Sequence, residues 1–266
     1  MGAGTGCDKA RGGYRGLVPL TFAYGSNLDP RQIAERCPGA VDEGPAALDE
    51  HELWFGGPSR LRGGGVLSVR PAPGRVQGRL WRIDEDGLAS LDRFEGHPGF
   101  YRRELLPVQS ARGACQAWVY RLRQDCFELA PRPAYLGQVR AVWTQLGLPL
   151  EPLLQASIRG RHAALFVYGT LRRGQANHGL LADSQFARAA ATRAAFQLVE
   201  LGRYPGMVAG SRSVLGEVWL VDASTLARLD ELEGHPHLYE RGLVQLHDGV
   251  PVEAYIYKGP LPSRLE

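Results

Sequence analysis

The alternation of hydrophobic and polar residues predicts a run of strands and helices that begins near residue 17. A strand is expected over Leu17–Tyr24. A helix should follow at Asp29-Pro30, with Asp as N-cap and Pro in the first turn, and run to about Cys37. Further strands are predicted at 46–55, 65–69, 76–83, 101–108 and 114–122, with helices at 84–94 and 134–146.

The same order of elements begins again after residue 162. A strand is expected at 164–168, and Gly216-Glu-Val-Trp repeats Gly78-Arg-Leu-Trp at an offset of 138. Leu91–Arg103 returns as Leu229–Arg241, with eight of thirteen positions matching. Solenoid repeats are normally about 20–45 residues, so a unit of roughly 100 residues indicates a tandem duplication of a whole domain.

This duplication predicts how the chain divides. The two domains are expected at 17–150 and 163–266, joined by a linker at 151–162 and preceded by a glycine-rich, disordered leader at 1–16. No apolar run has the length of a signal peptide or a membrane span. A soluble, cytoplasmic protein without a membrane partner is therefore expected, and its oligomeric state stays open.

Composition narrows the possible partners and chemistries. The chain has 266 residues, of which 44% are hydrophobic and 22% charged, as in ordinary globular proteins. The net charge is +3 and no basic stripe is present, so a nucleic-acid partner is not expected. The four cysteines form no CxxC pair and none recurs in both copies, which excludes a shared thiol nucleophile and suggests neither zinc nor disulfides.

A turn at the end of the first strand of each copy is the first candidate site. It reads Tyr24-Gly25-Ser26-Asn27 in one copy and Tyr168-Gly169-Thr170-Leu171 in the other. A strand that ends in Gly and a small hydroxyl residue leaves backbone N–H groups free to bind an anion. The alternative is a tight turn that only terminates a strand.

A Glu-Gly pair at the end of the short helix is the second candidate. Glu95 and Glu233 follow apolar residues, where a carboxyl would have a raised pKa and could exchange protons near neutral pH. The alternative is a solvated helix terminus with Gly as C-cap. Glu at this end opposes the helix dipole, however, so it is a poor choice for stability in both copies.

Three further residue types recur beside these glutamates. Asp92 and Asp230 are either paired acids or helix-capping groups, and Tyr101 and Tyr239 either close a pocket or pack in the core. His97 and His235 are expected to be loop or pocket-wall residues. A metal site needs three or four converging ligands, and the first loop has one histidine, so no metal is expected.

Together these residues resemble a known family. Phe22–Leu28, Leu91–Gly96 and the helix that ends at Gly147-Leu-Pro149 are similar to γ-glutamylcyclotransferases. Phe166–Gly174, Asn177-His178, Tyr204-Pro205 and Leu229–Gly234 resemble the AIG2-like branch, with its γ-glutamylamine cyclotransferases and BtrG-type deprotecting enzymes. The Asn at position 27 departs from the glutathione-specific branch, which has Leu there.

The resemblance implies an α+β fold in which each copy is a small mixed β-barrel with flanking helices. It also implies an enzyme that needs no cofactor or metal and releases 5-oxoproline and a free amine from a small γ-glutamyl substrate. Glu95 and Glu233 would be the acid/base residues. The substrate-binding residues would be Tyr24, Gly25, Ser26, Asn27, Leu28 and Tyr101 in the first copy, and Tyr168, Gly169, Thr170, Leu171, Arg172 and Tyr239 in the second.

Two alternatives to a doubly active enzyme stay open at this point. The barrels could bind γ-glutamyl or other small carboxylates without turnover, or one copy could be active while the other is structural. The identity of the leaving amine is also open. Its pocket is expected in the loops at 54–62 and 203–212.

Overall fold

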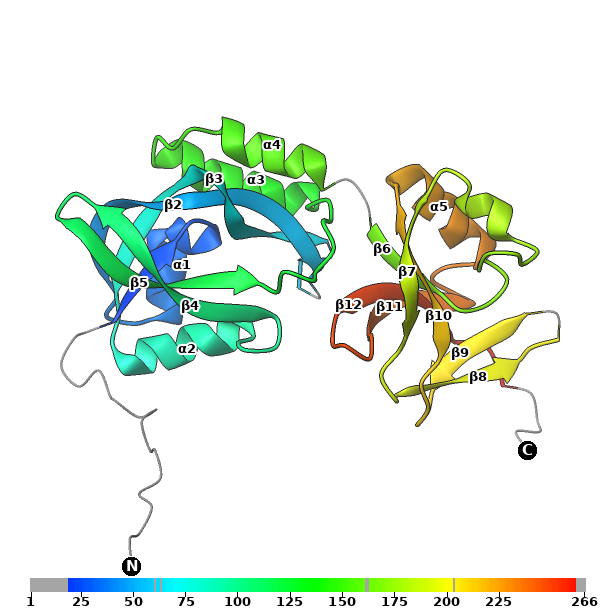
Figure 1. Ribbon diagram of the computed structural model, residues 1–266. Helices are drawn as coiled ribbons and strands as arrows, with labels where there is room; N and C mark the ends of the chain where they lie inside the picture. Colours follow the sequence, from blue (N-terminus) through cyan, green and yellow to red (C-terminus); the bar gives the residue numbers. More distant parts are fainter. Residues whose placement is uncertain (1–18, 60, 63, 161–162, 203, 262–266) are drawn as a thin grey trace, which may run out of the picture.

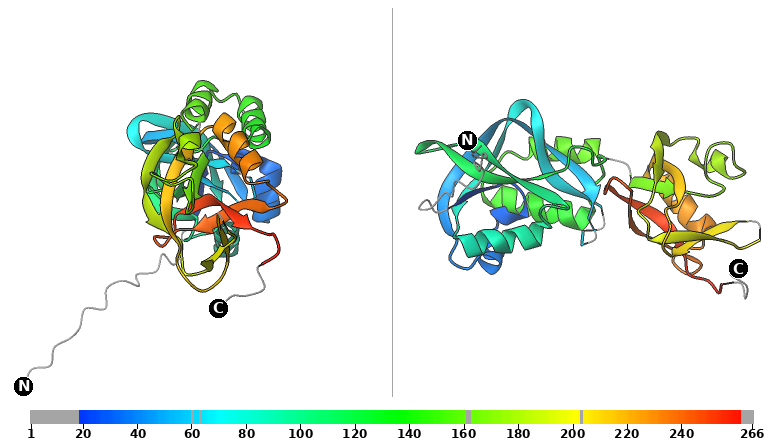
Figure 2. Two further views of the ribbon diagram at one scale, coloured as in Figure 1. Left: turned by 90° about the vertical axis from the view of Figure 1, so that its right-hand side faces the viewer. Right: turned by 60° about the horizontal axis from the view of Figure 1, so that its bottom comes forward.

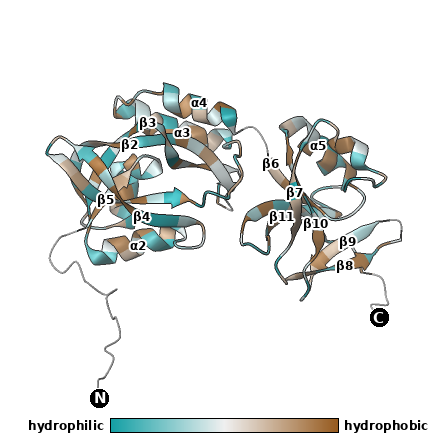
Figure 3. Cartoon of the chain, viewed as in Figure 1, coloured by the Kyte–Doolittle hydropathy of each residue, from teal (hydrophilic) through white to brown (hydrophobic). Residues whose placement is uncertain are grey.

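Two domains, each a β-sheet with helices beside it, lie next to one another in the computed structural model of the chain (Figures 1 and 2). The structure describes residues 19–59, 61–62, 64–160, 163–202 and 204–261, so the leader expected at 1–16 lies outside it. The architecture is mixed α+β in both halves, as predicted. Helices such as α4 carry both hydrophobic and hydrophilic residues, as expected for elements with one buried side (Figure 3).

A closed five-stranded barrel forms the first domain, in the order β1-β3-β2-β4-β5. Strand β1 is antiparallel to β3 and parallel to β5, which makes the barrel mixed. Its strands are β1 (Leu20–Ala23), β2 (Val41–Pro58), β3 (Gly65–Arg82), β4 (Tyr101–Ser110) and β5 (Gly113–Leu122).

Aspartate side chains cap the first two α-helices of this domain. Asp29 accepts a hydrogen bond from the Arg31 N–H at 2.9 Å, and Asp84 accepts one from the Gly87 N–H at 2.7 Å. Gly96 ends the second of these helices in the left-handed region, with φ of 64°. The elements are η1 (Ser26–Leu28), α1 (Pro30–Arg36), α2 (Glu85–Glu95), α3 (Pro133–Gln145) and α4 (Glu151–Arg159).

The structure differs from two sequence predictions for this domain. The segment 151–162, expected as a linker, contains α4, which buries Leu153 and Ala156 in the first domain's core and contacts β2. The stretches 46–55, 65–69 and 76–83 were expected as three strands. They are instead parts of one hairpin of two 18-residue strands. Prolines inside these strands, together with shifts of register, hid their continuity in the sequence.

The strands of the second domain have the same order as those of the first. Their sheet, however, does not close into a full barrel among the described residues. Its five-stranded sheet runs β11-β12-β6-β10-β7, and one antiparallel bridge joins Thr192 to Leu246 where the first barrel is closed by β2 and β4. A separate hairpin of β8 and β9 lies beside the sheet. The elements are β6 (Ala163–Val167), η2 (His178–Leu181), β7 (Gln185–Ala191), β8 (Phe196–Glu200), β9 (Pro205–Ala209), β10 (Leu215–Val221), α5 (Ala223–Leu232), β11 (Tyr239–Gln245) and β12 (Pro251–Tyr257).

One short segment of the first domain connects the two cores. The backbone of residues 127–129 is bonded to β2: Phe127 accepts from the Gly57 N–H, and the Leu129 N–H donates to Phe55, each at 3.1 Å. The Leu129 side chain, however, is 3% exposed and packs in the hydrophobic cluster of the second domain, with Phe127 partly buried against it. The two domains therefore share apolar surface.

Gly78 and its counterpart Gly216 lie where a strand passes close to its neighbour. A Cβ on Gly78 would collide with the carbonyl oxygen of Ala23 and the ring of Phe22. A Cβ on Gly216 would meet Val167 and Phe166 in the same way. This close approach explains why the glycine recurs at the same place in both copies.

We expect Gly78→Ala to lower the free energy of unfolding by at least about 1–3 kcal/mol, because the added methyl group has no room. The matched control is Gly137→Ala on α3, where a Cβ meets nothing within 4 Å. That change should be neutral or stabilise by about 0.5–1 kcal/mol. Urea denaturation checks both, and equal midpoints for the two variants would contradict the packing argument.

Candidate active sites

Glu95 at the end of α2 lies against the turn that follows β1. Its Oε1 accepts a hydrogen bond from Asn27 Nδ2 at 2.9 Å and forms an ion pair with Arg36 Nη1 at 3.3 Å. Arg36 also donates to Asn27 Oδ1 at 2.7 Å, so the three side chains form one network. The fold thus unites the two features that the sequence singled out separately.

The turns leave the same backbone donors free in both domains. The Leu28 N–H donates to the Gly25 carbonyl at 3.0 Å, and the Arg172 N–H donates to the Gly169 carbonyl at 3.2 Å. The preceding amides, 25–27 in one turn and 169–171 in the other, have no acceptor in the part of the chain that the structure describes. Each turn therefore has three consecutive N–H groups without an acceptor, whereas the fourth N–H donates a hydrogen bond within the turn.

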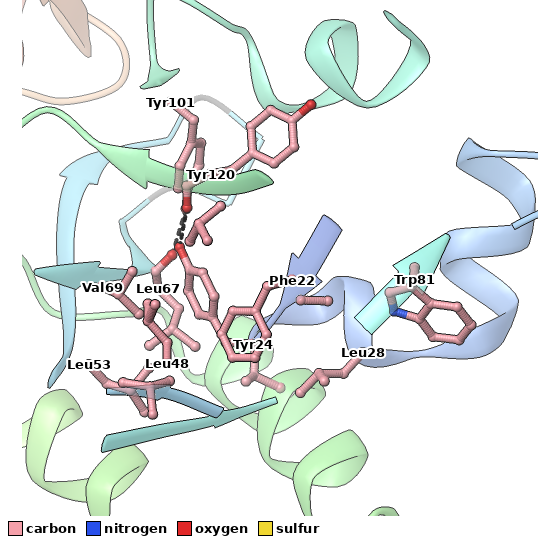
Figure 4. Packing of buried hydrophobic residues seen from close by; sticks show 14 of the residues in the cluster. Phe22, Tyr24, Leu28, Leu48, Leu53, Leu67, Val69, Trp81, Tyr101 and Tyr120 are labelled. Atoms are coloured by element: carbon pink, nitrogen blue, oxygen red, sulfur yellow. Dashed lines mark hydrogen bonds between the residues drawn. The ribbon is translucent and has the colours of Figure 1, made fainter. Parts of the chain in front are cut away.

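Buried tyrosines hold the first turn in place (Figure 4). The Tyr24 hydroxyl donates to the Tyr120 carbonyl, and Tyr101 donates to the Leu67 carbonyl at 2.7 Å. Trp143 of α3 donates from Nε1 to the Tyr24 carbonyl at 2.9 Å. Burial raises the pKa of both Tyr24 and Tyr101 above the ordinary range, so both hydroxyls stay protonated donors.

The first site consists of a narrow pocket that opens into a wider groove. The pocket has a volume of about 60 Å³ and is lined by Tyr24–Asn27, Glu95, Tyr101 and Tyr135 of α3, among others. The groove has a volume of about 720 Å³. Ser26, Glu95, Tyr101 and Tyr135 line both spaces, so the groove continues the pocket outward.

The second site is a single, larger pocket of about 320 Å³. It contains most of the residues predicted for this copy: Tyr168, Gly169, Thr170, Leu171, Glu233 and Tyr239. Arg172 is not among its lining residues. Asn177 lines the pocket and donates to Thr170 Oγ1 at 3.0 Å, rather than to the glutamate as Asn27 does.

The two carboxyl groups differ in their electrostatic surroundings. Burial raises the pKa of Glu95, while the Arg36 charge and the Asn27 hydrogen bond oppose that increase. Burial raises the pKa of Glu233 to about 7, and no opposing contact is found among the described residues. A carboxyl group with a pKa of about 7 can gain and lose a proton near neutral pH.

The repeated aspartates are neither paired acids nor helix caps. Asp92 accepts hydrogen bonds from Arg103 at 2.9 Å and from the Tyr120 hydroxyl at 2.7 Å. Asp230 accepts the equivalent bonds from Arg241 at 2.9 Å and from Tyr255 at 2.7 Å. These contacts fasten the helix to the strands beside it in both copies.

The repeated histidines also have a structural contact in common. The Nδ1 atom of His97 accepts a hydrogen bond from the Arg103 N–H at 3.2 Å, and His235 accepts one from the Arg241 N–H at 3.1 Å. Both histidines therefore hold the loop after the helix against the start of the next strand. Within the described ranges, no three His, Cys, Asp or Glu side chains come together as a metal site would require.

Sequence reasoning missed two residues of the first site. Arg36 carries no repeat signal, because the described residues of the second copy form no helix equivalent to α1. Tyr135 appeared only as one position of an apolar helix face, and α3 likewise has no counterpart in the described part of the second domain. The loops expected to bind the amine do contribute: Pro58, Ser59 and Arg62 line the groove, and Tyr204 and Pro205 line the second pocket.

Comparison with known proteins matches both domains to one family. A family model described as "Gamma-glutamyl cyclotransferase, AIG2-like" matches residues 21–138 and again 165–264. The γ-glutamylcyclotransferase of Bos taurus is 32% identical over 158 residues, covering 56% of this chain and 82% of that protein. The γ-glutamylaminecyclotransferase of Bos taurus is 39% identical over 116 residues, covering 37% and 66%.

A solved structure titled "Gamma-glutamyl cyclotransferase" is 30% identical, with a TM-score of 0.47 and coverage of 52% of this chain and 85% of that one. The two family matches span most of the chain. The protein belongs to the γ-glutamyl cyclotransferase, AIG2-like family and contains two copies of its domain. None of the helices in the described part is long and apolar enough to cross a membrane.

The Glu233 carboxyl should make stability depend on pH. Its native pKa of about 7 lies above the usual value of about 4.3 in an unfolded chain. The native state then binds more protons between these two values, so stability falls as the pH rises from about 4.3 to about 7. Glu233→Gln should remove this loss and stabilise the protein by about 1–2 kcal/mol near pH 8.

Near pH 5 the same substitution should stabilise the protein much less, because this pH lies only slightly above the unfolded pKa of about 4.3 and most of the loss accumulates between there and pH 7. Denaturation curves at the two pH values give the comparison. Glu231→Gln, at an exposed position on α5, is the matched control and should have no effect at either pH. Equal stabilisation by Glu233→Gln at both pH values would count against a buried, titrating carboxyl.

Proposed function

We propose that each domain cleaves a γ-glutamyl amide by intramolecular attack of the substrate's own α-amine, releasing 5-oxoproline and a free amine. One observation carries this proposal. In each copy, a half-buried glutamate lines the same pocket as a turn with three unused backbone N–H groups. Family membership supports the same reaction class.

The substrate carries both reacting groups, so the site needs only to fold it and move protons. The turn amides 25–27 or 169–171 would bind the carboxylate end of the γ-glutamyl group or the oxyanion. Holding the α-amine close to the γ-carbonyl carbon brings the large proximity advantage of an intramolecular reaction. Tyr101 or Tyr239 would close the pocket beside the acid/base group.

The glutamate would serve as base and then as acid. Glu95 or Glu233 takes a proton from the α-ammonium, and the α-nitrogen then forms a bond to the γ-carbon, closing a five-membered ring. The bond from that carbon to the leaving nitrogen breaks as the glutamate gives its proton to that nitrogen. The carboxylate then takes a second proton from the ring nitrogen and passes it to the departing amine, which leaves as an ammonium. No water is consumed, and the carboxyl ends in its starting state.

The two sites differ enough that unequal activity is the main alternative. Glu95 is held in an ion pair and a hydrogen bond, whereas Glu233 has neither among the described residues. An active second copy with a structural first copy would produce turnover that depends on Glu233 alone. Single substitutions separate this case from two active sites.

We expect the double variant Glu95→Gln, Glu233→Gln to lose about 10²–10⁴-fold in 5-oxoproline release from a panel of γ-glutamyl amines, because Gln cannot carry the proton. Each single variant should lose only the substrates of its own site. Glu240→Gln, at an exposed position outside both pockets, is the matched control. Full activity in the double variant would end the acid/base assignment, and bound ligand without turnover in wild type would indicate a binding module.

A further inference from the structure

The groove outside the first pocket is built by both domains. On one side lie residues of the first domain, including Glu95, Phe94 and Arg62. On the other side lie residues of the β11–β12 hairpin of the second domain: Leu243, Val244, Gln245, Gly249 and Pro251. Figures 1 and 2 show this hairpin facing the first domain. The second pocket has no such arrangement, since all its lining residues belong to the second domain.

The hairpin is fixed against the first domain. Arg123, which is bonded to Asp125, donates from Nη2 to the Asp248 carbonyl at 3.0 Å. The Asp248 carboxylate pairs with Arg188 at 2.6 Å, and the Arg188 guanidinium lies over the Phe127 ring of the first domain. Leu246 and Val250, at the two sides of the turn, are 1% exposed and share a cluster with Leu129. These contacts fix the β11–β12 hairpin in place as one wall of the groove.

The groove also has a strong excess of positive charge. Arg36, Arg62 and Arg93 line it, and Glu95 is the only acidic residue among its described lining residues. Arg36 is paired with Glu95. Arg62 donates to Gln138 and stacks on Tyr135, and within the described ranges neither Arg62 nor Arg93 forms an ion pair. Two cationic groups are therefore available to a ligand at the outer part of the groove.

We propose that the leaving amine of the first domain's substrate is bound across the domain boundary, between these arginines and the β11–β12 hairpin. This inference rests on the function proposed above. A γ-glutamyl group in the pocket beside Ser26 and Glu95 directs its amide nitrogen toward the groove, because those residues line both spaces. The chemical class that fits is an extended amine with a carboxylate at its far end.

The hairpin residues would therefore determine the specificity of a site in the other domain. Leu243 and Pro251 are half-buried and supply apolar surface, while Gln245 is exposed and bonded to Arg193. A negative charge placed on this wall would repel the carboxylate of the substrate. A short, neutral substrate would not reach the wall and would not be affected.

The test uses the full chain in a Glu233→Gln background, so that only the first site is measured. The probes are γ-glutamyl-aminohexanoate, its terminal carboxamide and γ-glutamyl-methylamide. We expect Leu243→Glu to raise KM for the acidic probe by about tenfold through like-charge repulsion and to leave the methylamide within about twofold. Pro251→Glu, at another half-buried residue of the hairpin that lines the groove, should act in the same direction if Leu243→Glu folds poorly.

His247→Glu is the matched control, because it adds the same charge to the same hairpin at an exposed residue outside the groove lining. It should leave KM unchanged for every probe. The inference is overturned if the folded variant, Leu243→Glu or Pro251→Glu, leaves KM for the acidic probe unchanged, or changes it no more than KM for its carboxamide. Turnover of the methylamide keeps the proposed reaction intact in that case, whereas no 5-oxoproline from any probe overturns both proposals.

Discussion

Removing a carboxylate from water at the end of a helix is costly, and both domains are built around that cost. A helix C-terminus repels negative charge, and burial adds a desolvation penalty. The first domain offsets the penalty with the Arg36 cation and the Asn27 amide. The second does not offset it in this way, and the pKa of Glu233 rises to about 7 instead. The equivalent glutamates of the two domains thus have different electrostatic surroundings.

The difference between the two sites follows from the helices that surround them. In the first domain, α1 supplies Arg36 and α3 supplies Tyr135 and the Trp143 hydrogen bond to the turn. Tyr135 lines the first pocket, which has a volume of about 60 Å³ and a groove outside it. The second domain has neither helix among its described elements, and its pocket is one space of about 320 Å³. The shared core of the site is the strand, the turn and the Glu-Gly helix end.

The sequence was most informative where the two copies agree. The repeat located α2 and α5, their glutamates and the turns after β1 and β6, because identical residues at matched spacing show which positions a shared site requires. It was uninformative about Arg36 and Tyr135, whose elements occur in one copy. Periodicity also failed in the long β2–β3 hairpin, where prolines interrupt it, and in α4, where two buried side chains were too few to reveal a helix. The aspartates and histidines that recur turned out to hold the helix and loop in place.

Each domain is one copy of the duplicated unit, but the segment at 127–129 links the stability of one copy to that of the other. Its backbone is bonded to the first barrel, yet Leu129 fills a position in the core of the second domain. Removing either half would expose Leu129 to water or leave a gap in the core that it occupies, and each would cost stability. The two domains therefore depend on each other for stability through one apolar side chain. Separating the copies would therefore destabilise each of them, even if each kept a complete site.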